Sequence, residues 1–266
     1  MLPLNQWRER ILKDPPGEDI IQDMLPNASS EYMLICGRAG IGKTNLALYL
    51  AFCLATAQPF FSHKTKQCRV GYLAFEGTQR KLLTRFDKLG SSFPDPGDFL
   101  LVDRSLPFKL VKDSVDKFGR KIDGLDVVII DPLRYIVPDD YMKPDPANNF
   151  VLTLKQVCAQ TGTVPILLHH IRKPDKRLTV QPEDLQYEIK GATEYVDAAA
   201  TVLLLERAPQ PKGKKGEFNP TNPDSRILHY VKVKDAPAEF EPLTLRFNRE
   251  KLIFEPQLED GFDSFL

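Results

Sequence analysis

The stretch from Gly37 to Thr44, GRAGIGKT, constrains the fold of this chain more than any other feature. It follows the apolar run YMLIC and precedes the apolar run NLALYLAFCLA, so it joins a strand-like segment to a helix-like one. Its glycines and its Lys-Thr pair have the spacing of a phosphate-binding loop. In such a loop backbone N–H groups turn towards phosphate oxygens, Lys43 reaches the β- and γ-oxygens, and Thr44 offers a hydroxyl to Mg²⁺. The residues expected to bind the nucleotide are Gly37, Arg38, Ala39, Gly40, Ile41, Gly42, Lys43, Thr44 and Asn45.

The composition is that of a globular protein without a general affinity for polyanions. The 266 residues are 42% hydrophobic, which suits a packed core, and 36 basic residues balance 36 acidic ones. Any contact with DNA or RNA must therefore come from a local basic patch.

The cysteines and the apolar runs indicate the cellular setting. The four cysteines have no C-x-x-C spacing, and three of them lie in apolar stretches, which predicts reduced, buried thiols rather than a metal site. The first residues lack the apolar core of a secretory signal, and no run approaches the roughly 18 apolar residues of a membrane span. We expect a soluble, cytoplasmic protein with no membrane partner.

From residue 31 onwards strand-like and helix-like segments alternate, which predicts an α/β fold with a mostly parallel sheet flanked by helices. Strands are expected at 32–36, 69–75, 99–102, 126–130 and 164–169, and helices at 43–57, 79–89 and 147–161. After about residue 190 four strand-like runs follow, ATVLLLERA, SRILHYVKVK, PLTLRFN and KLIFEP, joined by loops. These runs are expected to extend the same sheet with antiparallel C-terminal strands.

Charged or polar residues end the predicted parallel strands. Glu76 ends VGYLAFE, Asp131 ends LDVVIID, and His169 and His170 end VPILLHH. Because ligands of open α/β sheets bind beyond the carboxyl ends of the strands, these side chains are expected around the phosphate-binding loop. Asp131 is expected to hold Mg²⁺ together with Thr44, directly or through water. A simple Asp-Pro turn is the alternative for Asp131.

Three residues are catalytic candidates: Lys43, Glu76 and His170. Glu76 is placed to orient the water that attacks a phosphoryl group, a reaction that needs positioning more than covalent help. A solvated Glu that opens the next helix is the alternative. Side chains alternate along a strand, so one of the two histidines should face the nucleotide while the other packs. We expect His170 to sense the γ-phosphate and His169 to pack.

The order of these motifs resembles that of the RecA-like hexameric ATPases. Within that group it is most similar to the branch of the plasmid replicative helicase RepA, with DnaB-type helicases and KaiC as more distant relatives. The resemblance spans roughly residues 25–250 and rests on GRAGIGKT, YLAFEGTQRKLLTRFDKLG, VVIIDPLRYI, ILLHHIRKP and IKGATEYVDAAATVLLLE. It implies a RecA-like P-loop NTPase core at 31–256 that hydrolyses ATP with Mg²⁺, between an N-terminal lead-in at 1–30 and a tail at 257–266. It also supports Glu76 as the base and His170 as the sensor.

The resemblance further implies a homo-oligomeric ring, a hexamer in that family, with ATP at the subunit interfaces and the lead-in available for docking on a neighbour. A basic residue of the neighbouring subunit then completes the site. The candidates are Lys190, Lys232 and Lys234. The chain departs from the family here, because the run 198–200 is all alanine where RepA-like helicases carry an Arg, and Lys lacks the planar fork of Arg. A solvated strand face is the alternative for Lys232 and Lys234.

In ring helicases of this kind, the segments after the Asp strand and the His strand line the central channel. In this chain they are residues 137–149 and 171–190. The second segment carries a basic cluster that suits the backbone of single-stranded DNA. The DNA-contact candidates are Arg172, Lys173, Lys176 and Arg177. The aspartates of the first segment oppose such a contact, and a solvated loop is the alternative.

These motifs leave three functions open, of which the first is our expectation. It is a ring-forming ATPase that acts on single-stranded DNA, as a replicative helicase or a close derivative. The second is a RecA-fold ATPase that does not translocate, such as a KaiC-like switch or a recombination accessory that acts through a protein partner. The third, a small-molecule kinase, needs an Arg-rich lid and an acceptor pocket and gains nothing from a water-orienting Glu76.

Overall fold

A nine-stranded sheet with the order β3-β2-β4-β5-β1-β6-β7-β8-β9 organises the computed structural model of the chain. The structure describes residues 3–13, 18–97, 99–102, 109–140, 142–171, 189, 193–208 and 223–257. The strands are β1 (Met33–Gly37), β2 (Val70–Ala74), β3 (Phe99–Val102), β4 (Val127–Asp131), β5 (Val164–His170), β6 (Thr201–Arg207), β7 (Ser225–Val233), β8 (Leu243–Asn248) and β9 (Ile253–Pro256). β1 to β6 pair in parallel and β7 to β9 add to β6 in antiparallel fashion, as the sequence predicts.

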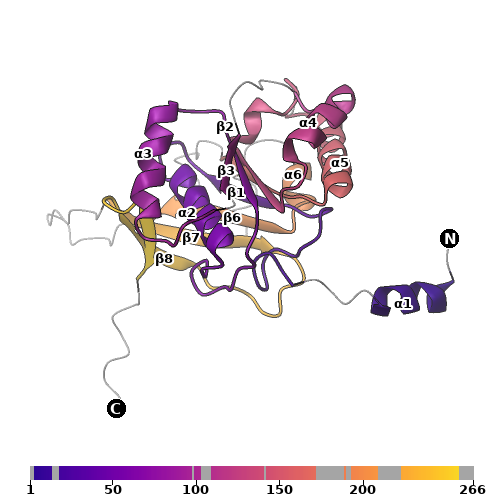
Figure 1. Ribbon diagram of the computed structural model, residues 1–266, viewed down its shortest axis with the longest axis horizontal. Helices are drawn as coiled ribbons and strands as arrows, with labels where there is room; N and C mark the ends of the chain where they lie inside the picture. The colour runs from indigo at the N-terminus through magenta and orange to yellow at the C-terminus, as the bar shows by residue number, and fades with distance from the viewer. Residues whose placement is uncertain are drawn as a thin grey trace, which may run out of the picture.

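Helices cover both faces of the sheet (Figure 1). These covering helices are α2 (Lys43–Thr56), α3 (Gln79–Gly90), α4 (Val115–Ile122), α5 (Pro144–Thr161) and α6 (Glu194–Asp197), with 3-10 turns η1 (Lys112–Ser114) and η2 (Leu133–Tyr135); a further helix, α1 (Leu4–Lys13), does not pack on the sheet. α2 and α3 lie on one face, and α4, α5 and α6 lie on the other. None of the helices in the described part of the chain is long and apolar enough to cross a membrane.

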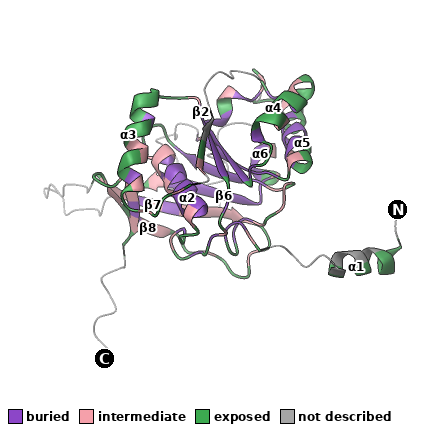
Figure 2. Ribbon diagram, viewed as in Figure 1, coloured by how far each residue is buried: buried purple, intermediate pink, exposed green. Residues whose placement is uncertain are grey.

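The alternation of side chains along the central strand β1 supplies two hydrophobic cores. Ile35 points to the face of α2 and packs in a cluster with Leu46. Leu34 and Cys36 point to the opposite face and pack in a cluster with Leu154 of α5. Because β1 is buried on both faces, it is apolar throughout, as central parallel strands are. Figure 2 shows the buried residues concentrated on the sheet and on the inner sides of α2, α5 and α6.

The packed body begins inside the stretch that the sequence analysis treats as a lead-in. Ile20, Ile21 and Leu25 are fully buried in the α2-side core, and the backbone N–H of Gln22 donates to the carbonyl of Lys64 at 2.9 Å. In the structure these residues form isolated bridges and a turn rather than a strand. They therefore lack the regular pattern by which a strand is recognised in sequence.

Helix α1 lies apart from the sheet in Figure 1. Its side chains Leu4 and Leu12 are 78% and 73% exposed. The described part of α1 therefore presents apolar groups to its surroundings.

Candidate active site

The carboxyl ends of β2, β4, β5 and β1 lie next to one another, because these strands are parallel neighbours in the sheet. A cavity of about 380 Å³ opens at this edge. Residues 39–40 and 42–45 of the phosphate-binding loop line it, with Glu76, Asp131 and His170 among the other lining residues. The structure thus brings together the four strand ends that the sequence analysis singled out.

The phosphate-binding loop has the backbone geometry that only glycine tolerates. Gly42 has φ +114° and immediately precedes α2, and a Cβ there would lie 3.1 Å from the ring of Phe254. A Cβ on Gly37 would lie 2.7 Å from the carbonyl oxygen of Leu205 on β6. Gly42 therefore needs glycine for its left-handed conformation, and Gly37 needs it because the backbone of β6 comes so close.

The ammonium group of Lys43 is hydrogen-bonded to the backbone of the loop. It donates to the carbonyls of Gly37 and Arg38 at 2.8 and 2.9 Å. Burial lowers the pKa of Lys43, and the negative charge of Asp131 acts in the opposite direction. A cation fixed at the centre of the loop is suited to bind an anionic phosphate group.

The carboxylate of Asp131, predicted to hold Mg²⁺, is held by two hydroxyl groups. Thr44 Oγ1 and the Tyr72 hydroxyl both donate to Asp131 Oδ2, each at 2.8 Å. Asp131 is only 7% exposed, and this burial raises its pKa although the two hydrogen bonds lower it. Carboxylate and hydroxyl oxygens side by side fit Mg²⁺, which completes its shell with water and phosphate oxygens. Tyr72 was not singled out from sequence, because it reads as an ordinary buried residue of β2.

Glu76 lies just beyond β2 and is paired with Arg134 of η2. The Arg134 guanidinium also donates to the Tyr135 hydroxyl at 3.1 Å and lies 4.9 Å from the centre of the Tyr135 ring. The Tyr135 ring in turn stacks on Phe75, with centroids 5.7 Å apart. Sequence reasoning missed Arg134, although it stands only three residues after Asp131 in VVIIDPLRYI.

The two histidines at the end of β5 face opposite ways, as strand alternation requires. His170 Nδ1 lies 3.4 Å from the Lys43 ammonium and lines the cavity. His169 is 2% exposed, and its ring lies 5.9 Å from that of Tyr195. The structure therefore places His170 at the cavity beside the phosphate-binding loop, and its role as a phosphate sensor stays a prediction.

Two basic residues of α3 also line the cavity, and sequence reasoning missed both. Lys81 and Arg85 stand one helical turn apart, so they lie on the same side of α3. Their i, i+4 spacing directly after Glu76 was the signal available in the sequence. They add positive charge to the lining of the cavity.

The candidates for trans action lie elsewhere or outside the described residues. Lys232 Nζ donates to the carbonyls of Val196 and Asp197 at 3.1 and 2.7 Å, at the end of α6. Lys234 pairs with Glu31 at 2.9 Å. Lys190 and the DNA-contact candidates Arg172, Lys173, Lys176 and Arg177 lie outside the described residues. The roles of all these residues stay predictions.

The sheet order, the phosphate-binding loop and the Thr44–Asp131 pair define a RecA-like P-loop ATPase. Residues 3–176, well over half of the chain, match the family described as AAA domain, and the chain belongs to this family of ATPases.

Solved structures share the fold at low sequence identity. A DnaB-like replicative helicase, described with its interactions with primase, is 16% identical, with a TM-score of 0.60 over 94% of this chain and 65% of the helicase chain. This chain therefore spans about two thirds of that helicase. The ATPase domain of the protein G40P is 15% identical, with a TM-score of 0.61 over 94% of this chain and 96% of that domain. A KaiC-like protein from the hyperthermophilic archaeon Pyrococcus horikoshii is 15% identical, with a TM-score of 0.58 over 91% and 96% of the two chains. No curated protein matches the sequence.

Proposed function

We propose that the chain is a Mg²⁺-dependent ATPase motor that assembles into a ring, a hexamer in the simplest case, and acts on single-stranded DNA in the manner of RepA-type replicative helicases. The observation that carries the proposal is the meeting of Lys43, Thr44, Asp131, Glu76 and His170 at one cavity. A P-loop kinase site does not need Glu76 there, whereas hydrolysis needs a group that orients water.

Each residue has a distinct task in the proposed reaction. Backbone N–H groups of the loop and the Lys43 ammonium bind the phosphates. Glu76 accepts a hydrogen bond from the attacking water and so directs it at the γ-phosphorus. His170, next to Lys43, reports the presence of the γ-phosphate. Mg²⁺ held by Thr44 and Asp131 neutralises charge on the phosphate oxygens when bound.

Ring assembly and DNA binding are supported by different parts of the chain. The exposed Leu4 and Leu12 of α1 offer apolar surface for a neighbouring subunit. The similarity to a DnaB-like replicative helicase over 94% of the chain supports action on DNA. The contact itself is assigned to the basic cluster at 172–177 predicted from sequence. A cytoplasmic location also stays a prediction.

The deciding experiment is the steady-state ATPase rate, measured with and without single-stranded DNA across a range of protein concentrations. A rate that rises with DNA and with protein concentration supports a ring on a strand. Replacing Arg172, Lys173, Lys176 and Arg177 with Ser should then abolish the DNA effect and reduce the salt dependence of DNA affinity. A DNA affinity and salt slope that do not change would contradict the assigned contact.

The second candidate function is a non-translocating switch that acts through a protein partner. Two of the three lysines that were expected to act in trans, Lys232 and Lys234, have partners in their own chain, and the run 198–200 lacks the arginine of RepA-like helicases. The similarity to a KaiC-like protein, with a TM-score of 0.58 over 91% of the chain, is close to that of the DnaB-like helicase, with a TM-score of 0.60. An ATPase rate indifferent to DNA at every protein concentration would favour this function.

A further inference from the structure

Arg226, at the start of β7, is a buried cation directly behind the phosphate-binding loop. It is only 6% exposed. Its Nε donates to the carbonyl of Ile41 at 3.0 Å, and its Nη1 donates to the carbonyls of Pro223 and Ser225 at 2.7 and 2.8 Å. A guanidinium stays protonated even where burial and nearby arginines lower its pKa, as they do for Arg226. The side chain therefore ties the loop to the Pro223–Ser225 turn.

The bond to Ile41 fixes the orientation of one particular peptide group. The Ile41 carbonyl and the Gly42 N–H belong to the same planar trans peptide, so they point in opposite directions. Arg226 holds the carbonyl on the side of β7. The Gly42 N–H is then directed to the other side, towards the cavity that Gly42 lines. A hydrogen bond to the carbonyl also polarises the peptide and makes its N–H a better donor.

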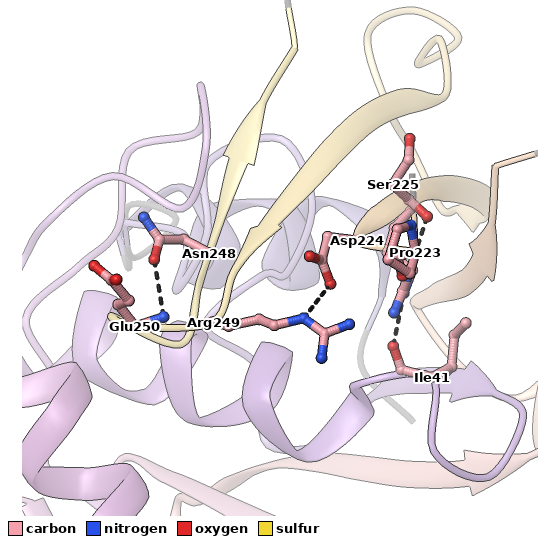
Figure 3. A network of polar contacts seen from close by, with 8 residues as sticks. Ile41, Pro223, Asp224, Ser225, Asn248, Arg249 and Glu250 are labelled. Atoms are coloured by element: carbon pink, nitrogen blue, oxygen red, sulfur yellow. Dashed lines mark hydrogen bonds and ion pairs between the residues drawn. The ribbon is translucent and has the colours of Figure 1, made fainter. Parts of the chain in front are cut away.

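The neighbouring strand supports the same peptide by packing. The Phe254 ring of β9 is 2% exposed and lies against Gly42, where an added Cβ would come within 3.1 Å of the ring. Figure 3 shows Ile41 facing the turn that contains Pro223 and Ser225. In that turn Asp224 pairs with Arg249 at 2.6 Å, which joins the turn to the β8–β9 hairpin. The antiparallel strands β7 to β9 thus form a wall behind the loop, that is, a packed surface that contacts the loop on the side away from the cavity.

The contacts of Lys43 explain why the loop needs this wall. In the structure the Lys43 ammonium bonds the carbonyls of Gly37 and Arg38 from inside the loop. When that ammonium turns to phosphate oxygens, it gives up these bonds. The bond from Arg226 comes from outside and does not compete with the ligand. It can hold the loop in the same conformation before and after binding.

We propose that Arg226 is a positioning residue that pre-organises the phosphate-binding loop by holding the Ile41–Gly42 peptide with its N–H towards the nucleotide phosphates. This inference rests on the proposed nucleotide binding at residues 37–45. Its consequence is that the antiparallel extension of the sheet contributes to nucleotide affinity without touching the nucleotide.

The test compares Arg226→Gln, Arg226→Lys and the control Arg246→Gln, each as the full chain. Arg246 is an exposed arginine on the neighbouring strand β8, so its replacement makes the same change in charge away from the loop. The measurements are the Kd of ADP, the KM and kcat for ATP, and the thermal unfolding of the protein without nucleotide. We expect Arg226→Gln to raise the Kd of ADP and the KM by about tenfold or more, as loss of a charged hydrogen bond does. kcat should stay within about twofold, because the groups that orient water are untouched.

The outcomes separate a positioning role from a purely structural one. Arg226→Lys keeps the positive charge but lacks the planar, forked guanidinium group. It should therefore recover only part of the affinity for ADP. An unchanged Kd in Arg226→Gln would overturn the inference, even if the protein unfolds at a lower temperature. If Arg226→Gln does not fold, an unchanged Kd in Arg226→Lys overturns it in the same way. A wild-type chain that binds no ADP would instead refute the proposed function.

Discussion

The guanidinium of Arg134 pairs with the carboxylate of Glu76, across the carboxyl ends of the adjacent strands β4 and β2. The side chains are 48% and 43% exposed, so the pair contributes little to the stability of the fold. Glu76, the residue proposed to orient water, lines the cavity, however, and Arg134 holds its carboxylate. The aromatic stack of Tyr135 on Phe75 gives Arg134 a fixed support. The pair is therefore better explained by control of Glu76 than by stability.

Glu76→Gln should abolish turnover while leaving nucleotide binding intact. The amide keeps the size of the side chain but cannot take up the proton of the attacking water, and general-base catalysis contributes about 10²–10⁴-fold. The measurements are kcat and the Kd of ATP. Lys43→Ala is the control, because it removes the cation at the centre of the loop and should lose binding itself. Equal loss of binding in both variants would show that Glu76 is not the base.

Arg134→Gln should lower kcat with little effect on KM or on unfolding. Without its cation, the Glu76 carboxylate samples more orientations, and imperfect orientation of the water lowers the rate. The free energy of unfolding should change by less than about 1 kcal/mol, as expected for an exposed pair. Urea unfolding and steady-state kinetics check both statements. A kcat equal to or above that of the wild type would mean that the pair does not serve to orient Glu76.

The residues at the strand ends could be predicted because a parallel sheet gathers them by its topology alone. The phosphate-binding loop is a local motif, and Glu76, Asp131 and His170 each end a recognisable strand. Their meeting at one cavity follows without knowledge of any side-chain contact. The alternation of a strand also sufficed to separate His170 from His169.

Tyr72 and Arg226, which hold residues of the site in place, could not be predicted because their partners depend on how strands distant in sequence pair. Tyr72 reaches Asp131 because Ala74 pairs with Asp131 between β2 and β4, 57 positions apart in the chain. Arg226 reaches Ile41 only because β7 folds back on β6. In sequence each reads as an ordinary strand residue. Helix α4 was missed for a different reason: its apolar residues Val115, Phe118 and Ile122 repeat at helical spacing, but the helix has only eight residues and a glycine among them, which lowers its intrinsic helix propensity.

Tyr72→Phe should weaken the metal site and make it more sensitive to acid. The variant removes one of the two hydrogen bonds that stabilise the Asp131 carboxylate, so the already raised pKa of Asp131 should rise further. A protonated carboxyl cannot hold Mg²⁺. The Mg²⁺ concentration for half-maximal ATPase rate should therefore increase as pH falls. In the variant this increase should begin at a higher pH than in the wild type. Superimposable Mg²⁺ titrations at all pH values would contradict this role of Tyr72.

Protonation of His63 should destabilise the fold under mildly acidic conditions. The His63 ring is packed between the N-terminal segment and the C-terminal sheet, with Nδ1 3.2 Å from the Gln22 carbonyl and the ring centroid 5.1 Å from that of Phe240. Burial lowers the pKa of His63 below its ordinary value of 6.5, so between its lowered pKa and 6.5 the unfolded chain binds more protons than the folded one. The stabilising contribution is complete above pH 6.5 and is lost as pH falls through this window.

Urea unfolding at pH 7.5, 6.5 and 5.5 measures that loss. His229 lies in the same sheet and also has a lowered pKa because of burial, although Glu206 opposes the shift, so it adds to the same slope. His63→Gln removes one of the two titrating groups and keeps a side-chain donor for the Gln22 carbonyl. The free energy of unfolding of His63→Gln should therefore depend less steeply on pH than that of the wild type. His229→Gln should remove the part of the pH dependence that comes from His229. If His63→Gln and the wild type lose stability in parallel across this range, His63 is not buried in its neutral form and the packing between the N-terminal segment and Phe240 must be looser than the structure indicates.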